Sequence, residues 1–145
     1  MTVPRELVAM LEGAPVVGAR EQAFPFITVD AGGFPHPALL SRAELEVGPA
    51  GELHAALRSR RTRANLERSG LAALIAVEGR TAHYVKLRVA RSLAVHDLLA
   101  CVFEVVEHKP DSLGIPLAPV TYEVTAEITR AERWDLTAEA LRLLR

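Results

Sequence analysis

The chain has 145 residues, is half hydrophobic and about a quarter charged, and carries a formal net charge of −1 at pH 7. This size predicts a single domain, residues 1–145, with room for a substantial core. Near-neutral charge excludes a bulk attraction to nucleic acid or to an anionic membrane surface, so any anion site must be local. No apolar run approaches the length of a membrane span or a signal-peptide core, and we expect a soluble, cytoplasmic protein.

The cysteine and histidine content argues against disulfide and metal chemistry. Cys101 is the only cysteine, and its apolar neighbours are typical of an inert core thiol. The five histidines lie too far apart in the chain for a local metal motif. We therefore predict no metal site.

The first half of the chain predicts a short helix followed by strands joined by turns. Residues 4–12 carry an apolar stripe at helical spacing, and residues 24–30 read as a strand. Prolines on both sides of His36 suit the irregular start of an edge strand. Residues 43–47 then read as a half-exposed strand that forms a hairpin with residues 53–57.

The middle of the chain predicts a helix between two strands. Residues 62–68 form one or two helical turns, and the continuous apolar run 71–77 indicates a strand buried on both faces. A turn at 78–80 leads into an alternating strand that begins at Thr81.

The last third contains one ambiguous segment. Asp97 followed by apolar residues at helical spacing favours a helix over 97–106, with a strand over 100–106 as the competing interpretation. Residues 109–119 read as a loop, 120–128 as an alternating strand, and 137–144 as a helix. Altogether the pattern predicts a mainly β (α+β) fold, in which about six antiparallel strands close into a small Greek-key barrel flanked by short helices.

The most unusual stretch is the basic turn, which we define as residues 58–63. Four arginines are interleaved with Ser59 and Thr62 directly before the predicted helix. Crowded arginines repel one another unless an anion offsets their charge, and a helix start favours anions through its free N–H groups. The alternative is a solvated loop, since arginines are mostly exposed. We predict a local anion site here.

Three motifs follow one another along the chain: Gly33-Phe34-Pro35-His36, the segment Ser59-Arg60-Arg61-Thr62-Arg63-Ala64-Asn65-Leu66, and Tyr84-Val85-Lys86-Leu87. Their order resembles the flavin-binding split-barrel family related to pyridoxamine 5′-phosphate oxidase. The resemblance covers residues 3–95. It implies a six-stranded split β-barrel and an obligate homodimer, with FMN bound in grooves between the subunits.

The resemblance also implies a set of cofactor-binding residues. The phosphate of FMN would lie against the basic turn and the helix that follows it. Asn65 would tie that helix to the site, and Lys86 would face the same groove. The implied phosphate ligands are Arg58, Ser59, Arg60 and Thr62.

One position departs from the family pattern. Many members carry a Lys three residues before the Asn, and Thr62 occupies that position here. A hydroxyl supplies a hydrogen bond but no charge, so Arg60 or Arg61 would have to carry the electrostatics of phosphate binding.

The function that the resemblance implies is an FMN-dependent oxidoreductase acting on a small-molecule substrate. The flavin would carry the redox chemistry, so no acid–base set is needed in the sequence. The alternative is a non-catalytic protein that binds or senses a flavin, a deazaflavin (F420) or haem in the same dimer groove. A third, structural interpretation makes the basic turn part of the dimer contact. No nucleic-acid or membrane partner is expected.

Overall fold

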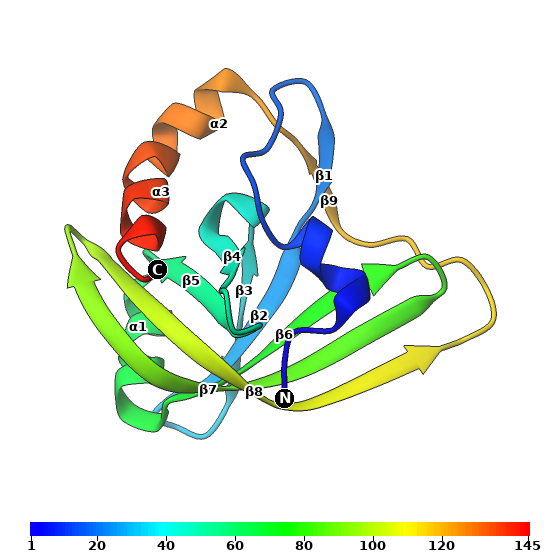
Figure 1. Ribbon diagram of the computed structural model, residues 1–145, viewed down its shortest axis with the longest axis horizontal. Helices are drawn as coiled ribbons and strands as arrows, with labels where there is room; N and C mark the ends of the chain where they lie inside the picture. The colour runs from blue at the N-terminus through cyan, green and yellow to red at the C-terminus, as the bar shows by residue number, and fades with distance from the viewer.

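The computed structural model describes residues 1–145 as one curled antiparallel sheet with a few helices (Figure 1). Seven strands form the main sheet in the order β3-β2-β6-β7-β8-β5-β4, and every neighbouring pair is antiparallel. Two further short strands, β1 (Arg20–Gln22) and β9 (Thr121–Glu123), pair with each other outside it. The strands of the main sheet are β2 (Phe24–Val29), β3 (Pro35–Leu40), β4 (Leu45–Val47), β5 (Leu53–Leu57), β6 (Leu71–Glu78), β7 (Thr81–Val95) and β8 (Leu98–Ser112).

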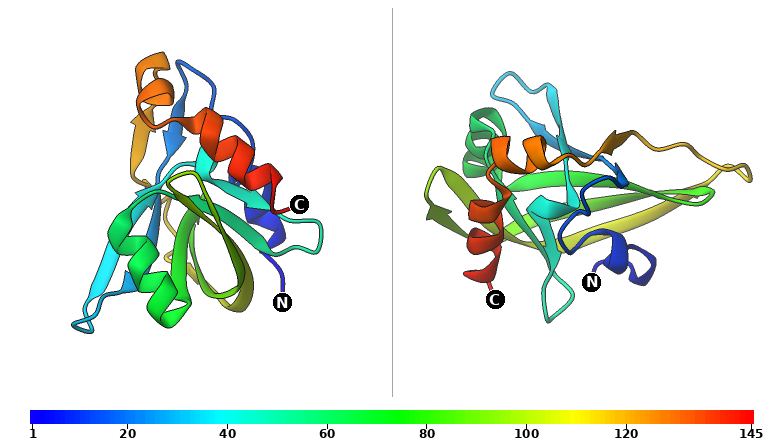
Figure 2. Two further views of the ribbon diagram at one scale, coloured as in Figure 1. Left: turned by 90° about the vertical axis from the view of Figure 1, so that its left-hand side faces the viewer. Right: turned by 90° about the horizontal axis from the view of Figure 1, so that it is seen from above.

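Helices connect the two edges of the sheet and cover its open side. The edge strands β3 and β4 follow each other in the chain and are joined by the 3-10 turn η2 (Arg42–Glu44), which draws the sheet into a half-barrel. A second 3-10 helix, η1 (Arg5–Met10), precedes the sheet, and α1 (Arg60–Ser69) connects β5 to β6. The chain ends with α2 (Ala126–Ala131) and α3 (Trp134–Arg142), which follow each other along one side of the molecule (Figure 2).

The inner face of the curled sheet holds the main core. Phe26 and Phe103 are fully buried there, with ring centroids 5.8 Å apart in an edge-to-face arrangement. Cys101 is fully buried in the same cluster, and burial raises the pKa of its thiol to about 12. The thiolate is therefore not formed at neutral pH, in agreement with the predicted inert core thiol.

A second, smaller apolar cluster lies on the outer face of β5 and β8, where α3 packs. Ala56 and Ala100 are fully buried against Ala140, Leu141 and Leu144 of the C-terminal segment. Small side chains on the strands let the helix approach closely. Strand β5 is thus buried on both faces.

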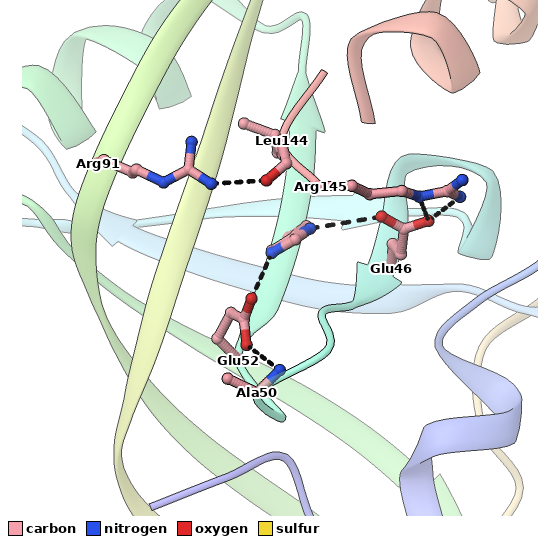
Figure 3. Close-up of polar contacts among 7 residues, drawn as sticks. Glu46, Ala50, Glu52, Arg91, Leu144 and Arg145 are labelled. Carbon is pink, nitrogen blue, oxygen red and sulfur yellow. Dashed lines mark hydrogen bonds and ion pairs between the residues drawn. The ribbon is translucent and has the colours of Figure 1, made fainter. Parts of the chain in front are cut away.

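Polar contacts fix the end of the chain beside this cluster (Figure 3). The Arg91 guanidinium donates to the Leu144 carbonyl at 2.6 Å, and Arg145 pairs with Glu46. The fully buried His54 lies between two carboxylates, with Nδ1 3.4 Å from Glu46 and Nε2 2.9 Å from Glu52.

Several expectations are confirmed. The edge position of β3, the β4–β5 hairpin, α1 and α3 all lie where the sequence predicted them. Nine strands replace the expected six, because β1 was not foreseen and β8 lies where a helix was favoured.

The predicted helix over 97–106 is wrong, because this segment begins the fifteen-residue strand β8. Strand β8 pairs with β7 along its length, and Asp97 lies in the turn between them beside His96, which has a φ of 55°. The inner face of β8 meets the main core and its outer face meets α3, so both faces are apolar and the period of two disappears. The predicted loop 109–119 accordingly starts only after Ser112.

Two strand predictions also need correction. Of residues 120–128 only Thr121–Glu123 form a strand, because the Thr125 hydroxyl accepts the Ile128 N–H at 3.1 Å and caps α2. Strand β6 is fully buried on one face only, since Leu74 and Ala76 are buried whereas Leu71 is 48% exposed. The predicted N-terminal helix is present as a 3-10 helix.

Candidate functional site

A cavity of about 390 Å³ opens beside the basic turn. Its walls come from the end of β3, η2, the end of β5, β9 and the α2–α3 segment. The volume lies within the range of small-molecule sites, about 300–1,000 Å³. Three of the predicted phosphate ligands line it: Arg58, Ser59 and Thr62.

One part of the cavity wall presents groups that favour an anion. The Ser59 hydroxyl caps α1 by accepting the Thr62 N–H at 3.4 Å, so the start of this ten-residue helix borders the cavity. Thr62 is 1% exposed, lines the cavity, and its Oγ1 has no hydrogen-bond partner in the protein. An unpartnered buried hydroxyl costs free energy unless a ligand or water satisfies it. The helix dipole favours a negative ligand at this place.

The arginines of the basic turn divide into paired and free groups. Arg58 contacts the Asp97 carboxylate at 2.8 Å and donates to the Glu132 carbonyl at 3.1 Å. Arg60 and Arg61 are exposed at the first turn of α1, and neither side chain makes a hydrogen bond or ion pair within the chain. They supply positive charge next to the cavity without lining it.

The other two predicted site residues lie outside the cavity. The Asn65 amide donates to the Thr28 hydroxyl at 2.9 Å and thereby ties α1 to β2. Lys86 lies on β7, pairs with Glu107 at 2.8 Å, and its side chain is 66% exposed. The structure brings Arg58, Ser59 and Thr62 together and leaves Lys86 on another face.

The cavity is also lined by polar residues that the sequence analysis did not identify. The hydroxyls of Ser41 and Tyr122 are 2.6 Å apart, and the ring of Tyr122 meets that of Trp134 edge-on at 6.5 Å. Glu44 closes a capping box on η2, in which its carboxylate accepts the Ser41 N–H at 3.0 Å. The Ser-x-x-Glu spacing of this box was readable in the sequence, whereas the approach of Tyr122 depends on tertiary structure.

Burial governs the protonation of this wall. It raises the pKa of Glu44 to about 7, and the neighbouring Glu132 adds to the effect, whereas the Ser41 N–H and Arg58 oppose it. Burial also raises the pKa of Tyr122. Both groups favour their neutral, proton-bearing forms.

A second cavity of about 400 Å³ lies on the other side of Trp134. Of its arginines, Arg42 already donates to the carbonyls of Ala9 and Glu12, and Arg145 pairs with Glu46. None of the predicted site residues lines this cavity, and we place the candidate site in the first.

No group of three or more His, Cys, Asp or Glu side chains is arranged to hold a metal ion. None of the helices has both the length and the hydropathy that a membrane crossing requires.

Solved structures with a similar fold come from flavin-related proteins. The chain superimposes on the styrene monooxygenase flavin reductase of Pseudomonas putida S12 with a TM-score of 0.57 at 10% identity, over 73% of this chain and 88% of that one. The TM-score with an F420 reductase is 0.56 at 13% identity, over 74% of this chain and 98% of that one. The TM-score with the flavoredoxin of Desulfovibrio vulgaris (Miyazaki F) is 0.53 at 12% identity, over 77% of this chain and 86% of that one.

These identities are low, so the likeness speaks for the fold alone. No protein-family model matches the chain, and no curated protein matches it by sequence. The chain therefore has the fold found in flavin reductases and flavoredoxin.

Proposed function

We propose that the protein binds FMN in the cavity beside the basic turn and works as a flavin-dependent oxidoreductase. The observation that carries the proposal is Thr62, a buried hydroxyl without a partner at a helix start that also carries arginines. A phosphate group supplies both the hydrogen-bond acceptor and the negative charge that this place lacks. The shared fold of flavin reductases makes a flavin the natural bearer of that phosphate.

Each residue of the proposed anion site would have a distinct task. Thr62 Oγ1 and the free N–H groups of α1 would donate to phosphate oxygens, and Arg58 and Arg60 would supply charge. Asn65 would hold α1 in place against β2 through its bond to Thr28. Thr62 stands where many members of the family related to pyridoxamine 5′-phosphate oxidase carry a Lys, so the arginines must carry the charge alone.

The protein's part in the chemistry is to bind and orient. A bound flavin supplies hydride or electron transfer to or from a small-molecule substrate. The apolar side chains Leu39, Leu57 and Trp134 border the same cavity and would exclude water from the ring.

Titration with FMN tests this proposal. The visible absorption of the purified protein is recorded first, and the protein is then titrated with FMN while flavin fluorescence is followed. We expect saturable binding that weakens about tenfold or more in Arg58→Ala, because Arg58 lines the cavity and a charge-assisted contact contributes roughly 1.5–3 kcal/mol. Arg88→Ala is the matched control, since Arg88 pairs with Glu104 on the outer face of the sheet. Absence of FMN binding by the wild-type protein would contradict the proposal.

A deazaflavin is the second candidate ligand. The F420 reductase with a similar fold favours it. A parallel titration with F420 under the same conditions decides between the two, because the preferred ligand must bind at least about tenfold more tightly. Turnover of a reduced nicotinamide by the flavin-loaded protein then separates an enzyme from a non-catalytic carrier.

The homodimer is also part of the proposal. In a dimer the partner subunit would cover the open side of the groove, and the exposed Leu39, at 58%, lies on the β3 edge beside the cavity. Sedimentation equilibrium should give twice the chain mass of 15.7 kDa. A monomer that still binds FMN tightly would show that the site is complete in one chain.

A further inference from the structure

The cavity is also lined by a second polar group, whose chemistry differs from that of the proposed phosphate ligands. Glu44 lines the cavity wall, and one of its carboxylate oxygens is fixed by the Ser41 N–H at 3.0 Å. No arginine, lysine or histidine forms an ion pair with Glu44, and its second oxygen has no hydrogen-bond partner in the protein. A half-buried carboxyl group thus faces the cavity without a counter-ion.

The charged groups around Glu44 compensate its negative charge only in part, through Arg58. The Arg58 guanidinium is directed to Asp97 and the Glu132 carbonyl, and Arg42 of η2 is directed to the carbonyls of Ala9 and Glu12. The remaining neighbours are Glu132 from the α2–α3 segment, Glu21 from β1, which pairs with Arg42, and Tyr122 from β9. Two of these carry negative charge. A desolvated carboxyl among like charges retains its proton more strongly, which agrees with its raised pKa.

The hydroxyl groups of Ser41 and Tyr122, beside Glu44, also retain one hydrogen that no protein group accepts. Ser41 Oγ accepts the Ala43 N–H at 3.0 Å and shares a hydrogen bond with Tyr122 at 2.6 Å. Whichever oxygen donates in that bond, the other hydroxyl keeps its hydrogen free. These hydroxyls therefore present a donor to the cavity, which Arg58 and the start of α1 also border.

We infer that Glu44 is a ligand-binding residue that donates a hydrogen bond from its neutral carboxyl group to an uncharged acceptor on the ring of the bound molecule. The site then selects a ligand with an anionic group at one end and a neutral acceptor, such as a carbonyl or heteroaromatic nitrogen, at the other. This inference rests on the proposed function, which supplies a ligand of that kind. It assigns the specificity to a residue outside the predicted phosphate ligands.

Proton linkage makes the inference testable through binding alone. Ionisation of Glu44 removes the donor and places a negative charge against the acceptor. For one group that titrates at a pKa of about 7, affinity then falls by about 30-fold between pH 6 and pH 8.5. Glu44→Gln keeps an oxygen for the Ser41 N–H and an N–H donor for the ligand at every pH, so its affinity should not show this fall.

The experiment is a titration with FMN at pH 6, 7, 8 and 8.5, followed by flavin fluorescence, for wild type, Glu44→Gln and Glu104→Gln. The ratio of wild-type to Glu44→Gln affinity cancels the titration of the phosphate of FMN itself. We expect this ratio to fall about 30-fold across the range for a group with a pKa near 7. Glu104 pairs with Arg88 and does not line the cavity, so Glu104→Gln should keep the wild-type profile.

The outcomes separate this inference from the proposed function. FMN binding with the same pH profile in wild type and Glu44→Gln overturns the role of Glu44 and leaves the flavin site standing. Absence of FMN binding in both proteins at every pH overturns both. Circular dichroism of Glu44→Gln checks that the variant is folded, and Glu44→Asp, which retains an acid, should bind weakly but keep the pH dependence.

Discussion

Two buried polar regions of this protein differ in how completely the protein satisfies them. In the His54 cluster, formed by His54, Glu46, Glu52 and Arg145, both ring nitrogens of the buried histidine have a carboxylate within 3.4 Å. In the cavity, Thr62 Oγ1 has no partner and Glu44 has no counter-ion. A folded protein ordinarily satisfies its buried polar groups. The His54 cluster therefore contributes to structure, whereas the unsatisfied groups of the cavity are the ones for which we propose a ligand from outside the chain.

The largest effect should come from breaking the satisfied region. His54→Leu removes the partner of Glu46 and Glu52, and we expect the free energy of unfolding to fall by about 2–4 kcal/mol. Urea denaturation measures this loss. In the absence of urea, where the variant is folded, its affinity for FMN should stay within about twofold of wild type.

His36→Leu is the control for that substitution, because His36 is half-buried on β3 and makes no side-chain hydrogen bond. It should change stability by less than about 0.5 kcal/mol. An equal loss in both variants would contradict a special role for the His54 cluster.

The next largest effect should be the pH dependence of the free energy of unfolding that Glu44 causes. The pKa of Glu44 in the folded protein is raised from 4.5 to about 7, so its contribution to stability is fully present below pH 4.5 and is lost as pH rises through 7. Glu44→Gln escapes this loss, and relative to wild type it should gain up to about 3 kcal/mol between pH 4.5 and pH 8. Urea denaturation at both pH values measures the difference. A stability difference that does not vary with pH would show that Glu44 titrates normally.

Thr62→Val tests the unpartnered hydroxyl with a change of little more than one polar atom. Because Oγ1 has no partner in the protein, stability should hold or rise by less than about 1 kcal/mol, whereas FMN affinity should fall by about tenfold. Fluorescence titration and thermal unfolding measure the two effects separately.

Thr137→Val is the matched control for Thr62→Val, and we expect the opposite pattern of stability and FMN affinity. Thr137 is also buried, but its hydroxyl donates to the Arg133 carbonyl at 3.3 Å. This variant should lose about 1 kcal/mol of stability and keep its FMN affinity. Similar behaviour of the two threonine variants would remove the distinction between the regions.

The smallest effect should come from the ion pair at the mouth of the cavity. Asp97 holds Arg58 at 2.8 Å and competes with a phosphate for its charge. Asp97→Asn should therefore raise FMN affinity about threefold at low salt, with a stability change below about 0.5 kcal/mol. Glu104→Gln breaks an exposed pair on the outer face and should leave affinity unchanged. Weaker binding in Asp97→Asn would mean that Asp97 orients Arg58 for the ligand.

Local patterns were sufficient for one part of this fold and one end of its site. The hairpin at β4–β5, the helix α1 and the cluster of Arg58, Ser59 and Thr62 are set by neighbours in sequence, and each was predicted. Ser59 shows why, since its capping of α1 is a contact over three residues.

The remaining features depend on contacts between distant segments. The sequence of strand β8 favours a helix because both of its faces are apolar, and its outer face is apolar because α3 covers it. The Ser41–Tyr122 pair joins residues 81 positions apart, and Lys86 leaves the site because β7 turns its side chain toward Glu107. Periodicity within one segment cannot contain such information.

The most direct test of the central claim compares FMN with riboflavin, which lacks the phosphate, in one fluorescence titration of the wild-type protein. If the basic turn and the start of α1 hold a phosphate, FMN should bind at least about tenfold more tightly, and Thr62→Val should reduce that advantage. Equal affinity for the two ligands, or binding of neither, would contradict a flavin-phosphate site at this cavity.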